Sequence, residues 1–227
     1  PAAAGRAVAR MSRRGVSRPE QASCPMKLRS SAPSPFGRKV KIAAVLCGIH
    51  LDVEQADTNN PADSLRQQNP LGKIPVLLRE EGGPLYDSRV ILEYLDTAAG
   101  GGAILPKSGE PRFAALTTQA LADGLMDAAL LQVYEARFRP AEIHSDTWLD
   151  HQAGKVTRAL ALFEAAPPQR AEVTAAADVG EIAVACALGY LDLRFAGSWR
   201  ADHPALVAWL DAFAARVPAF EATRYRG

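Results

Sequence analysis

Hydrophobic and polar positions follow two different patterns in the two halves of the chain. From Met26 to about Thr97, short β-like runs alternate with helical patterns, whereas the sequence that follows is helical throughout. Such a change predicts an α/β domain followed by an all-helical domain. We therefore expect domains at 26–97 and 109–227, joined by a glycine-rich linker at 98–108 that cannot continue a helix.

The first half contains four strand-like segments and two helical ones. The expected strands are Met26–Ser30, Leu51–Ala56, Ile74–Arg79 and a short segment around Leu85. One helix begins at Ser34-Pro35, where a hydroxyl residue precedes a proline at the first helical position, and another begins at Asp87-Ser88. The apolar residues of the first helix recur at helical spacing as far as Cys47, and Gly48 suits its C-terminal end.

The second half contains four helical blocks separated by prolines. They occupy roughly 109–138, 145–165, 178–195 and 203–217. Asp178 stands three residues before Glu181, a capping-box pattern that opens an almost uniformly apolar helix. Because this helix lacks a polar face, we expect it to be buried in the middle of the helical domain, in a structural role.

Composition and charge narrow the possible function classes. The chain has 227 residues, of which 48% are hydrophobic and 22% charged, so it has enough apolar material for a packed core. The net charge of +1 combines +4 in residues 1–25 with −3 in residues 26–227. We expect residues 1–25 to be an extension outside the fold, with an arginine-rich organellar transit peptide as the alternative. The acidic remainder gives no reason to expect a nucleic-acid partner.

Cysteine and histidine spacing indicates neither a disulfide framework nor a metal site. The three cysteines form no CxxC pair, and the four histidines form no H-x-x-x-H pattern. No uncharged apolar run approaches the ~18 residues that span a bilayer. We therefore expect a cytoplasmic chain without a metal and without a membrane partner.

Ser34 is the first candidate for chemistry. It stands at the start of a helix, where unpaired backbone N–H groups and the helix dipole favour negative charge. A thiol bound there would ionise more easily, and lowering its pKa from ~8.5 by about two units makes thiolate dominant at neutral pH. From spacing alone, a helix cap is the plainer explanation of Ser34, and Ser31 is the nearest alternative hydroxyl.

Two further segments can hold parts of a small zwitterionic ligand. A glycine-containing turn with Lys73 leads into Ile74-Pro75, and a cis bond there would expose the N–H and C=O of Ile74 to an extended peptide. At Asp87-Ser88, the serine and free helix amides can bind a carboxylate while the aspartate pairs with an ammonium. The plainer alternatives are an ordinary loop-to-strand proline and a simple helix cap.

Other polar and aromatic residues have plainer interpretations. We expect the basic residues of the first helix, Arg38, Lys39 and Lys41, to lie on its solvated face. The aromatic residues Tyr134, Phe138 and Trp148 are more typical of the core than of a ligand site.

Three motifs in series resemble the glutathione S-transferase family, in particular bacterial members whose first helix opens with Ser-Pro-Phe. They are Ser34-Pro35-Phe36-x-Arg38-Lys39-Val40, NPLGKIPVL at 69–77 and LYDSRVILEYL at 85–95. The resemblance covers nearly all of 26–227. It implies a thioredoxin-like β-α-β-α-β-β-α domain followed by an all-helical domain, and it implies a homodimer.

The resemblance also assigns roles to residues of this sequence. It implies that Ser34 is the catalytic hydroxyl that contacts the sulfur of the co-substrate glutathione. It implies that Ile74, before a cis Pro75, pairs with the cysteinyl unit, that Asp87 and Ser88 hold the γ-glutamyl group, and that Lys73 lies near the same groove. The other substrate is expected to be a small, largely apolar electrophile.

Some alternatives remain open within this resemblance. Cys47 lies thirteen residues after Ser34 and points inward by helical register, so we do not expect it to act as a catalytic thiol. Proteins of this fold also serve as glutathione-binding stress or structural modules, or as isomerases, dehalogenases or ether-cleaving enzymes. Residues of the helical domain, with Tyr134 and Phe138 as candidates, are expected to line the electrophile pocket.

Overall fold

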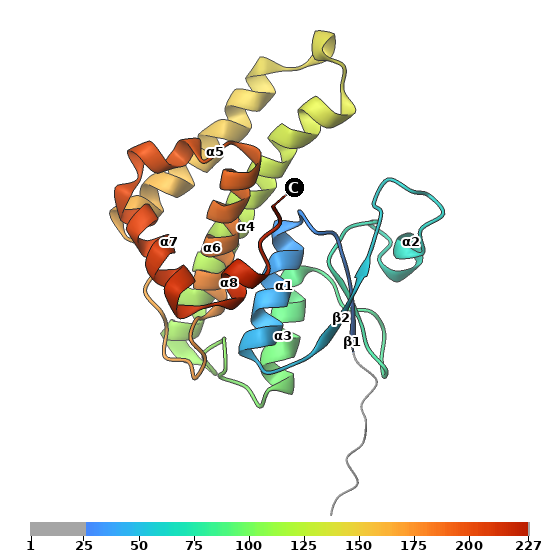
Figure 1. The fold of residues 1–227 in the computed structure, drawn as a ribbon, viewed down its shortest axis with the longest axis vertical. Helices are drawn as coiled ribbons and strands as arrows, with labels where there is room; N and C mark the ends of the chain where they lie inside the picture. The colour runs from blue at the N-terminus through green and yellow to red at the C-terminus, as the bar shows by residue number, and fades with distance from the viewer. Residues whose placement is uncertain (1–25, 227) are drawn as a thin grey trace, which may run out of the picture.

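A computed structural model describes residues 26–226 of the chain (Figure 1). Its first half is made of β1 (Met26–Ser30), α1 (Pro35–Leu46), β2 (Leu51–Gln55), α2 (Leu65–Gln68), β3 (Val76–Leu78) and α3 (Ser88–Ala98). Its second half is made of α4 (Gly109–Phe138), α5 (Asp146–Ala165), α6 (Val179–Arg194), α7 (Pro204–Arg216) and α8 (Ala219–Ala222), with short 3-10 turns at Ala141–Ile143 and Ser198–Asp202. The predicted succession of an α/β part and an all-helical part is confirmed. The predicted extension at 1–25 lies outside the described residues.

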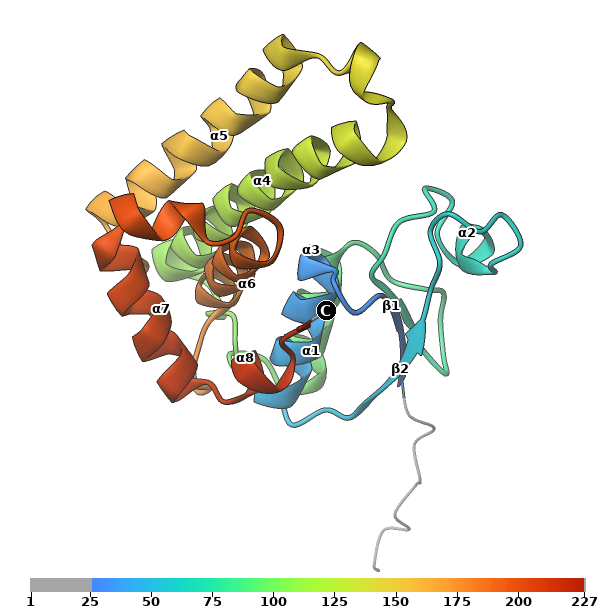
Figure 2. The same ribbon diagram turned by 45° about the horizontal axis from the view of Figure 1, so that its top comes forward.

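A small mixed sheet forms the base of the first half. Its strand order is β2-β1-β3, with β1 parallel to β2 and antiparallel to β3. Leu28, in the middle of β1, is fully buried and pairs with Val53 on one side and Leu77 on the other. Helices α1 and α3 lie between the sheet and the helical half, and α2 lies toward the opposite side (Figures 1 and 2).

The predicted fourth strand around Leu85 is wrong. Leu85 exchanges two backbone hydrogen bonds with Leu77, of 3.0 and 2.9 Å, and forms only an isolated bridge. Pro84 has no amide hydrogen to extend the ladder, and Asp87 already caps α3. The other strands are close to prediction, although β3 begins only after Pro75, for the same lack of a donor.

Helix α1 crosses β1 at very close range. A Cβ atom added to Gly37 would lie 1.9 Å from Ser30 Oγ and 3.2 Å from Ser30 Cβ, so a side chain here would displace the Ser30 hydroxyl and crowd β1. The backbone N–H of Gly37 also donates to Ser34 Oγ at 3.1 Å. The helix ends as predicted, with Gly48 in the left-handed region at φ +67°. The crossing fixes the position of Ser34 at the end of the sheet.

Helix α6 is the buried centre of the helical half, as its apolar sequence predicts. Every residue from Val179 to Leu188 is buried. The predicted capping box is present, since the Asp178 carboxylate accepts from the N–H groups of Gly180 and Glu181 at 2.8 and 3.0 Å. Helix α6 packs on both α4 and α1, and the apolar core therefore runs continuously through both halves.

The glycine-rich connection between α3 and α4 is held by one carboxylate. Gly100, Gly101 and Gly102 all have positive φ, at +97°, +77° and +85°. The Asp96 carboxylate accepts hydrogen bonds from the N–H groups of Gly102, Ile104 and Leu105. Our division of the chain at 98–108 remains a prediction.

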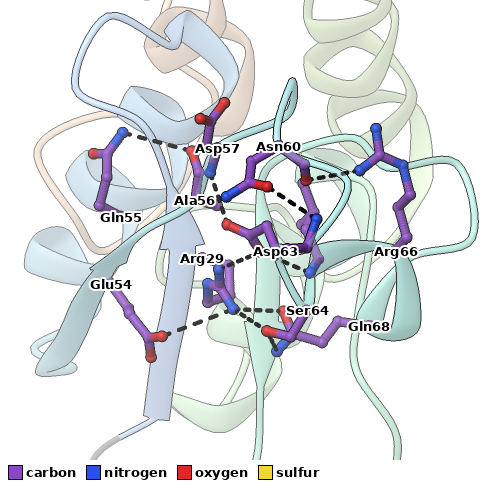
Figure 3. Close-up of polar contacts among 12 residues, drawn as sticks. Arg29, Glu54, Gln55, Ala56, Asp57, Asn60, Asp63, Ser64, Arg66 and Gln68 are labelled. Carbon is purple, nitrogen blue, oxygen red and sulfur yellow. Dashed lines mark hydrogen bonds and ion pairs between the residues drawn. The ribbon is translucent and has the colours of Figure 1, made fainter.

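A buried arginine joins the loop before α2 to the sheet (Figure 3). Arg29 on β1 donates to Asp63 Oδ1 at 2.7 Å and to Ser64 Oγ at 2.8 Å, and its guanidinium lies 3.7 Å from Glu54. These contacts position the segment that leads through α2 to the turn at Asn69. No helix within residues 26–226 is long and apolar enough to cross a bilayer.

Candidate functional site

Ser34 lies at the wall of a cavity of about 280 Å³. The cavity is bounded by the start of α1, by α6, and by the chain end at 224–226, which passes the N-terminal end of α1 (Figures 1 and 2). Ser34 is the N-cap of α1, with an extended backbone, and its Oγ accepts from the N–H of Gly37. Because that bond uses an oxygen lone pair, the hydroxyl hydrogen is available for another group.

The Ile74–Pro75 peptide bond is cis, as the family resemblance implies. The preceding turn is shaped by the buried Asn69, whose Nδ2 donates to the carbonyl of Lys73 at 2.9 Å and whose Oδ1 accepts from the N–H of Leu71 at 3.1 Å. Within residues 26–226, the backbone N–H and C=O of Ile74 make no hydrogen bond. Both groups are therefore available to pair with an extended peptide.

Asp87 and Ser88 start α3 and have polar partners there. Asp87 is the N-cap, and its carboxylate accepts from the N–H of Arg89 at 3.0 Å and lies 3.2 Å from the Arg89 guanidinium. Burial acts to raise the pKa of Asp87, but the hydrogen bonds and charge of Arg89 outweigh it and hold that pKa below its usual range. Asp87 is therefore an anion at neutral pH.

The prediction that the basic residues of the first helix are solvated is wrong for two of the three. Lys39 is fully buried, with Nζ 2.5 Å from Asp123 Oδ1 and 3.3 Å from Ser88 Oγ, and Arg38 is buried against α8. Lys41 is partly exposed. The reason is that α1 is covered by the sheet on one side and by the helical half on the other, which leaves little of its surface in water.

The Lys39–Asp123 pair lies beneath Ser88 in a desolvated environment. Burial lowers the pKa of Lys39 and raises the pKa of Asp123, and in each case the partner's charge acts against the burial. Asp123 Oδ2 lies 3.6 Å from the Nε of Arg89, so the pair continues to the surface of α3. The buried Lys39 ammonium thus donates a hydrogen bond to Ser88 Oγ from the interior of the protein.

Three residues of this site were not identified from the sequence: Lys39, Arg89 and Asp123. Asp123 lies 84 residues from Lys39, and no local pattern joins the two. The available signal was the presence of an aspartate inside the apolar run of α4, since a buried carboxylate needs a cationic partner. Lys73, by contrast, is exposed, and its charge acts to lower the pKa of Asp127, which burial and the neighbouring Asp123 raise.

Comparison with known proteins identifies the family. A family model described as "Glutathione S-transferase, N-terminal domain" matches residues 33–98. A second model, described as "Glutathione S-transferase, C-terminal domain", matches residues 146–212. The uncharacterized GST-like protein YibF of Escherichia coli (strain K12) is 38% identical over 183 residues, which are 80% of this chain and 90% of that protein. The chain belongs to the glutathione S-transferase family.

Solved structures of glutathione transferases agree with this assignment. The crystal structure of a family member from Pseudomonas fluorescens Pf-5 with bound glutathione is 41% identical, with a TM-score of 0.79, and the alignment covers 89% of this chain and 100% of that chain. A Pseudomonas fluorescens Pf-5 structure with bound S-(propanoic acid)-glutathione is 40% identical, with a TM-score of 0.76 and coverages of 88% and 100%. The thioredoxin-like fold class is therefore confirmed.

The two cysteines that the structure describes in this glutathione S-transferase are poorly suited to act as thiolates. Burial raises the pKa of the Cys47 thiol to about 11, with a smaller contribution from Asp96. Burial also raises the pKa of Cys186 to about 11, against the opposing charges of Arg38 and Lys39. Cys47 follows the C-terminal end of α1, a full helix away from Ser34. Both thiols stay protonated at neutral pH.

The aromatic residues expected in the core are partly on the surface instead. Phe138 is 60% exposed and meets the ring of the half-buried Tyr134 edge-on, while Trp148 is 41% exposed and stacks on His151. The prediction is wrong for Phe138 and Trp148 because the end of α4 and the start of α5 extend beyond the other helices (Figure 1). The cavity beside Ser34 is lined by Tyr190 and neither Tyr134 nor Phe138.

Proposed function

We propose that this protein is an active glutathione transferase, in which Ser34 is the catalytic residue and the bound sulfur attacks a small electrophile. The observation that carries the proposal is the position of Ser34 at the N-terminus of α1 and at the wall of a cavity. Its oxygen already accepts from Gly37, so its hydroxyl can donate to a thiolate. Together with the helix dipole, that donor would stabilise the anionic sulfur.

Glutathione binding is assigned to the turn at Ile74–Pro75 and to the start of α3. The free backbone groups of Ile74, held outward by Pro75, would pair with the cysteinyl unit. Asp87 would accept hydrogen bonds from the γ-glutamyl ammonium. Ser88 and the first backbone amides of α3 would donate to the γ-glutamyl carboxylate. Lys73 is exposed near the same turn and would contribute a further cation to an anionic tripeptide.

The chemical step needs no covalent change to the protein. The glutathione thiol loses its proton to water, and the thiolate forms a sulfur–carbon bond with the electrophilic carbon. At a substituted carbon, the bond to the leaving group breaks and that group departs with the electron pair. The neighbour from Pseudomonas fluorescens holds a glutathione with a carboxylate-bearing sulfur substituent, which supports a site that accommodates S-conjugates.

Retention and turnover measurements test the proposal. The full chain should be retained on glutathione resin, elute with free glutathione and turn over some members of a panel of aryl halides, epoxides and hydroperoxides. Retention without turnover on any of them would favour a glutathione-binding stress or structural module. Absence of retention would reject both functions.

We also propose a role in detoxification and a cytoplasmic homodimer. The dimer rests on the family, and light scattering of the purified chain checks it. The cytoplasmic location is supported by Cys47 and Cys186, which are both free thiols, as proteins of reducing compartments have.

A further inference from the structure

We propose that the electrophile used by this enzyme carries a carboxylate or a similar single anionic group, bound by Arg38 at the inner wall of the cavity beside Ser34. The inference rests on the proposed function and adds the substrate class to it. It adds one anionic group to the sequence-based expectation of a small, largely apolar electrophile.

Arg38 is a buried cation with one free end. It is only 8% exposed, its Nη2 donates to the carbonyl of Phe220, and its Nε donates to Thr223 Oγ1 at 3.3 Å. The guanidinium also lies 4.0 Å from the centre of the Phe220 ring. Within residues 26–226, its Nη1 has no hydrogen-bond partner. Nη1 is not sealed from solvent, so an anionic group in the cavity can accept a charge-assisted hydrogen bond from it.

Gly189 on α6 provides the space for this free end. A Cβ atom at Gly189 would lie 2.5 Å from Arg38 Nη1. Both residues line the cavity that Ser34 also lines. The contacts to the Phe220 carbonyl, the Phe220 ring and Thr223 therefore hold the guanidinium at the cavity wall. Its free end fits there because Gly189 has no side chain.

The other charged groups around the cavity leave it positive. Arg224 and Arg226 line it as well, and Arg226 forms no ion pair with a carboxylate of residues 26–226. Asp192 is the acidic residue of the lining, but both of its oxygens are occupied by Arg200, and Oδ1 also accepts from the indole of Trp199. Arg224 is paired with Glu221 at 2.6 Å. An entering anion would thus meet two uncompensated arginines, Arg38 and Arg226.

The spacing along α1 matches a short substituent on sulfur. Ser34 and Arg38 are four residues apart, and the N–H of Arg38 donates to the carbonyl of Ser34 at 3.0 Å. Side chains with this separation have Cβ atoms about 5–6 Å apart on one helix face. A carboxylate placed two or three bonds beyond a sulfur at Ser34 is therefore within range of the Arg38 guanidinium.

A matched pair of glutathione conjugates tests the inference. S-(2-carboxyethyl)glutathione and S-(3-methylbutyl)glutathione have sulfur substituents of the same size and shape, but only the first is charged. We expect calorimetry on the full chain to show about tenfold tighter binding of the carboxylate conjugate, as expected for a hydrogen bond between charged groups. Equal binding of the two would overturn the inference and leave the proposed function intact, whereas binding of neither would reject the proposed function itself.

Variants of the two arginines locate the effect. Arg38→Met should abolish the tenfold preference and Arg38→Lys should restore part of it, because lysine keeps the charge without the planar fork. Arg226→Gln is an exposed change that leaves the packing of α8 intact, and it should reduce the preference at least about twofold. Arg158→Gln, on the exposed face of α5 and outside the cavity, should leave it unchanged.

The same variants should change substrate choice. The ratio of kcat/KM for 2-chloro-5-nitrobenzoate, whose carboxylate lies three bonds from the bound sulfur, to that for 1-chloro-2,4-dinitrobenzene should fall about tenfold in Arg38→Met relative to the unaltered chain. If Arg38→Met does not fold, Arg38→Lys is measured with the same two substrates, and it should lower the ratio by less than tenfold. A ratio that neither variant changes would contradict the assignment of the anion to Arg38.

Discussion

Lys39 Nζ lies 2.5 Å from Asp123 Oδ1, and this buried ion pair joins α1 of the sheet-bearing half to α4 of the helical half. Both side chains are almost wholly buried, so removing one partner would leave an uncompensated charge in the core. The same lysine contacts Ser88 Oγ, which is assigned to the ligand. The proposed glutathione site therefore shares one ammonium group with the buried ion pair.

We predict that Lys39→Met lowers the free energy of unfolding by about 3–5 kcal/mol. The double variant Lys39→Met with Asp123→Leu should recover most of that loss, since an apolar pair carries no desolvation cost. Urea unfolding at neutral pH measures both. A double variant no more stable than the single one would show that the ion pair is not the cause.

We predict that Ser34→Ala lowers turnover with an aryl halide about 10- to 100-fold while the Kd for glutathione changes little, because the hydroxyl acts on the developing thiolate. Ser34→Thr keeps the hydroxyl and should retain most activity. Ser31→Ala is the control at the neighbouring hydroxyl and should be active. Titrating the ultraviolet absorbance of bound glutathione should show a higher thiol pKa in Ser34→Ala. Unaltered turnover and thiol pKa in that variant would reject the role of Ser34.

We predict that Asp87→Asn weakens glutathione binding about tenfold, since it removes the proposed partner of the ammonium. Asparagine is as good an N-cap as aspartate, so the stability of α3 should change by only a few tenths of a kcal/mol. Calorimetry and thermal unfolding separate the two effects. A large fall in Tm with normal binding would assign Asp87 to capping alone.

We predict a loss of stability at alkaline pH that depends on Cys186. Burial raises its folded pKa to about 11, from an ordinary value of 9.0, so the folded state holds the thiol proton more tightly than the unfolded state. The part of the unfolding free energy that depends on the protonated Cys186 thiol is fully present below pH 9 and is lost as the pH rises toward 11. At pH 10 it amounts to a loss of about 1.4 kcal/mol relative to pH 7.

The measurement compares unfolding free energies at pH 7 and pH 10 in the unaltered chain and in Cys186→Ala. Ionising groups common to both chains cancel in the difference between them, and so does the packing cost of the substitution. The pH-dependent loss should be smaller by about 1.4 kcal/mol in the variant. Equal losses in the two chains would show that Cys186 does not hold its proton as proposed.

The sequence alone determined the long helices and three of the four expected strands, because those signals are local, but not the short helices α2 and α8. Hydroxyl and carboxylate caps at Ser34 and Asp178, the left-handed Gly48 and the apolar periodicity all act within a few residues of the chain. The predicted bounds of the four long helices agree with α4, α5, α6 and α7 to within a residue or so. The three family motifs were readable for the same reason, since each is continuous in sequence, and the family that they indicated is confirmed.

Tertiary structure alone decided which polar residues are buried and what they contact. Helical periodicity separates one face of α1 from the other, but it does not reveal that a second layer covers the basic face and buries Lys39 and Arg38. The partners Asp123 and Phe220 lie 84 and 182 residues away, where no local pattern extends. A buried charge is defined by what surrounds it in space, so the ion pair under Ser88 and the arginine beside Ser34 emerge only once the two halves are packed together.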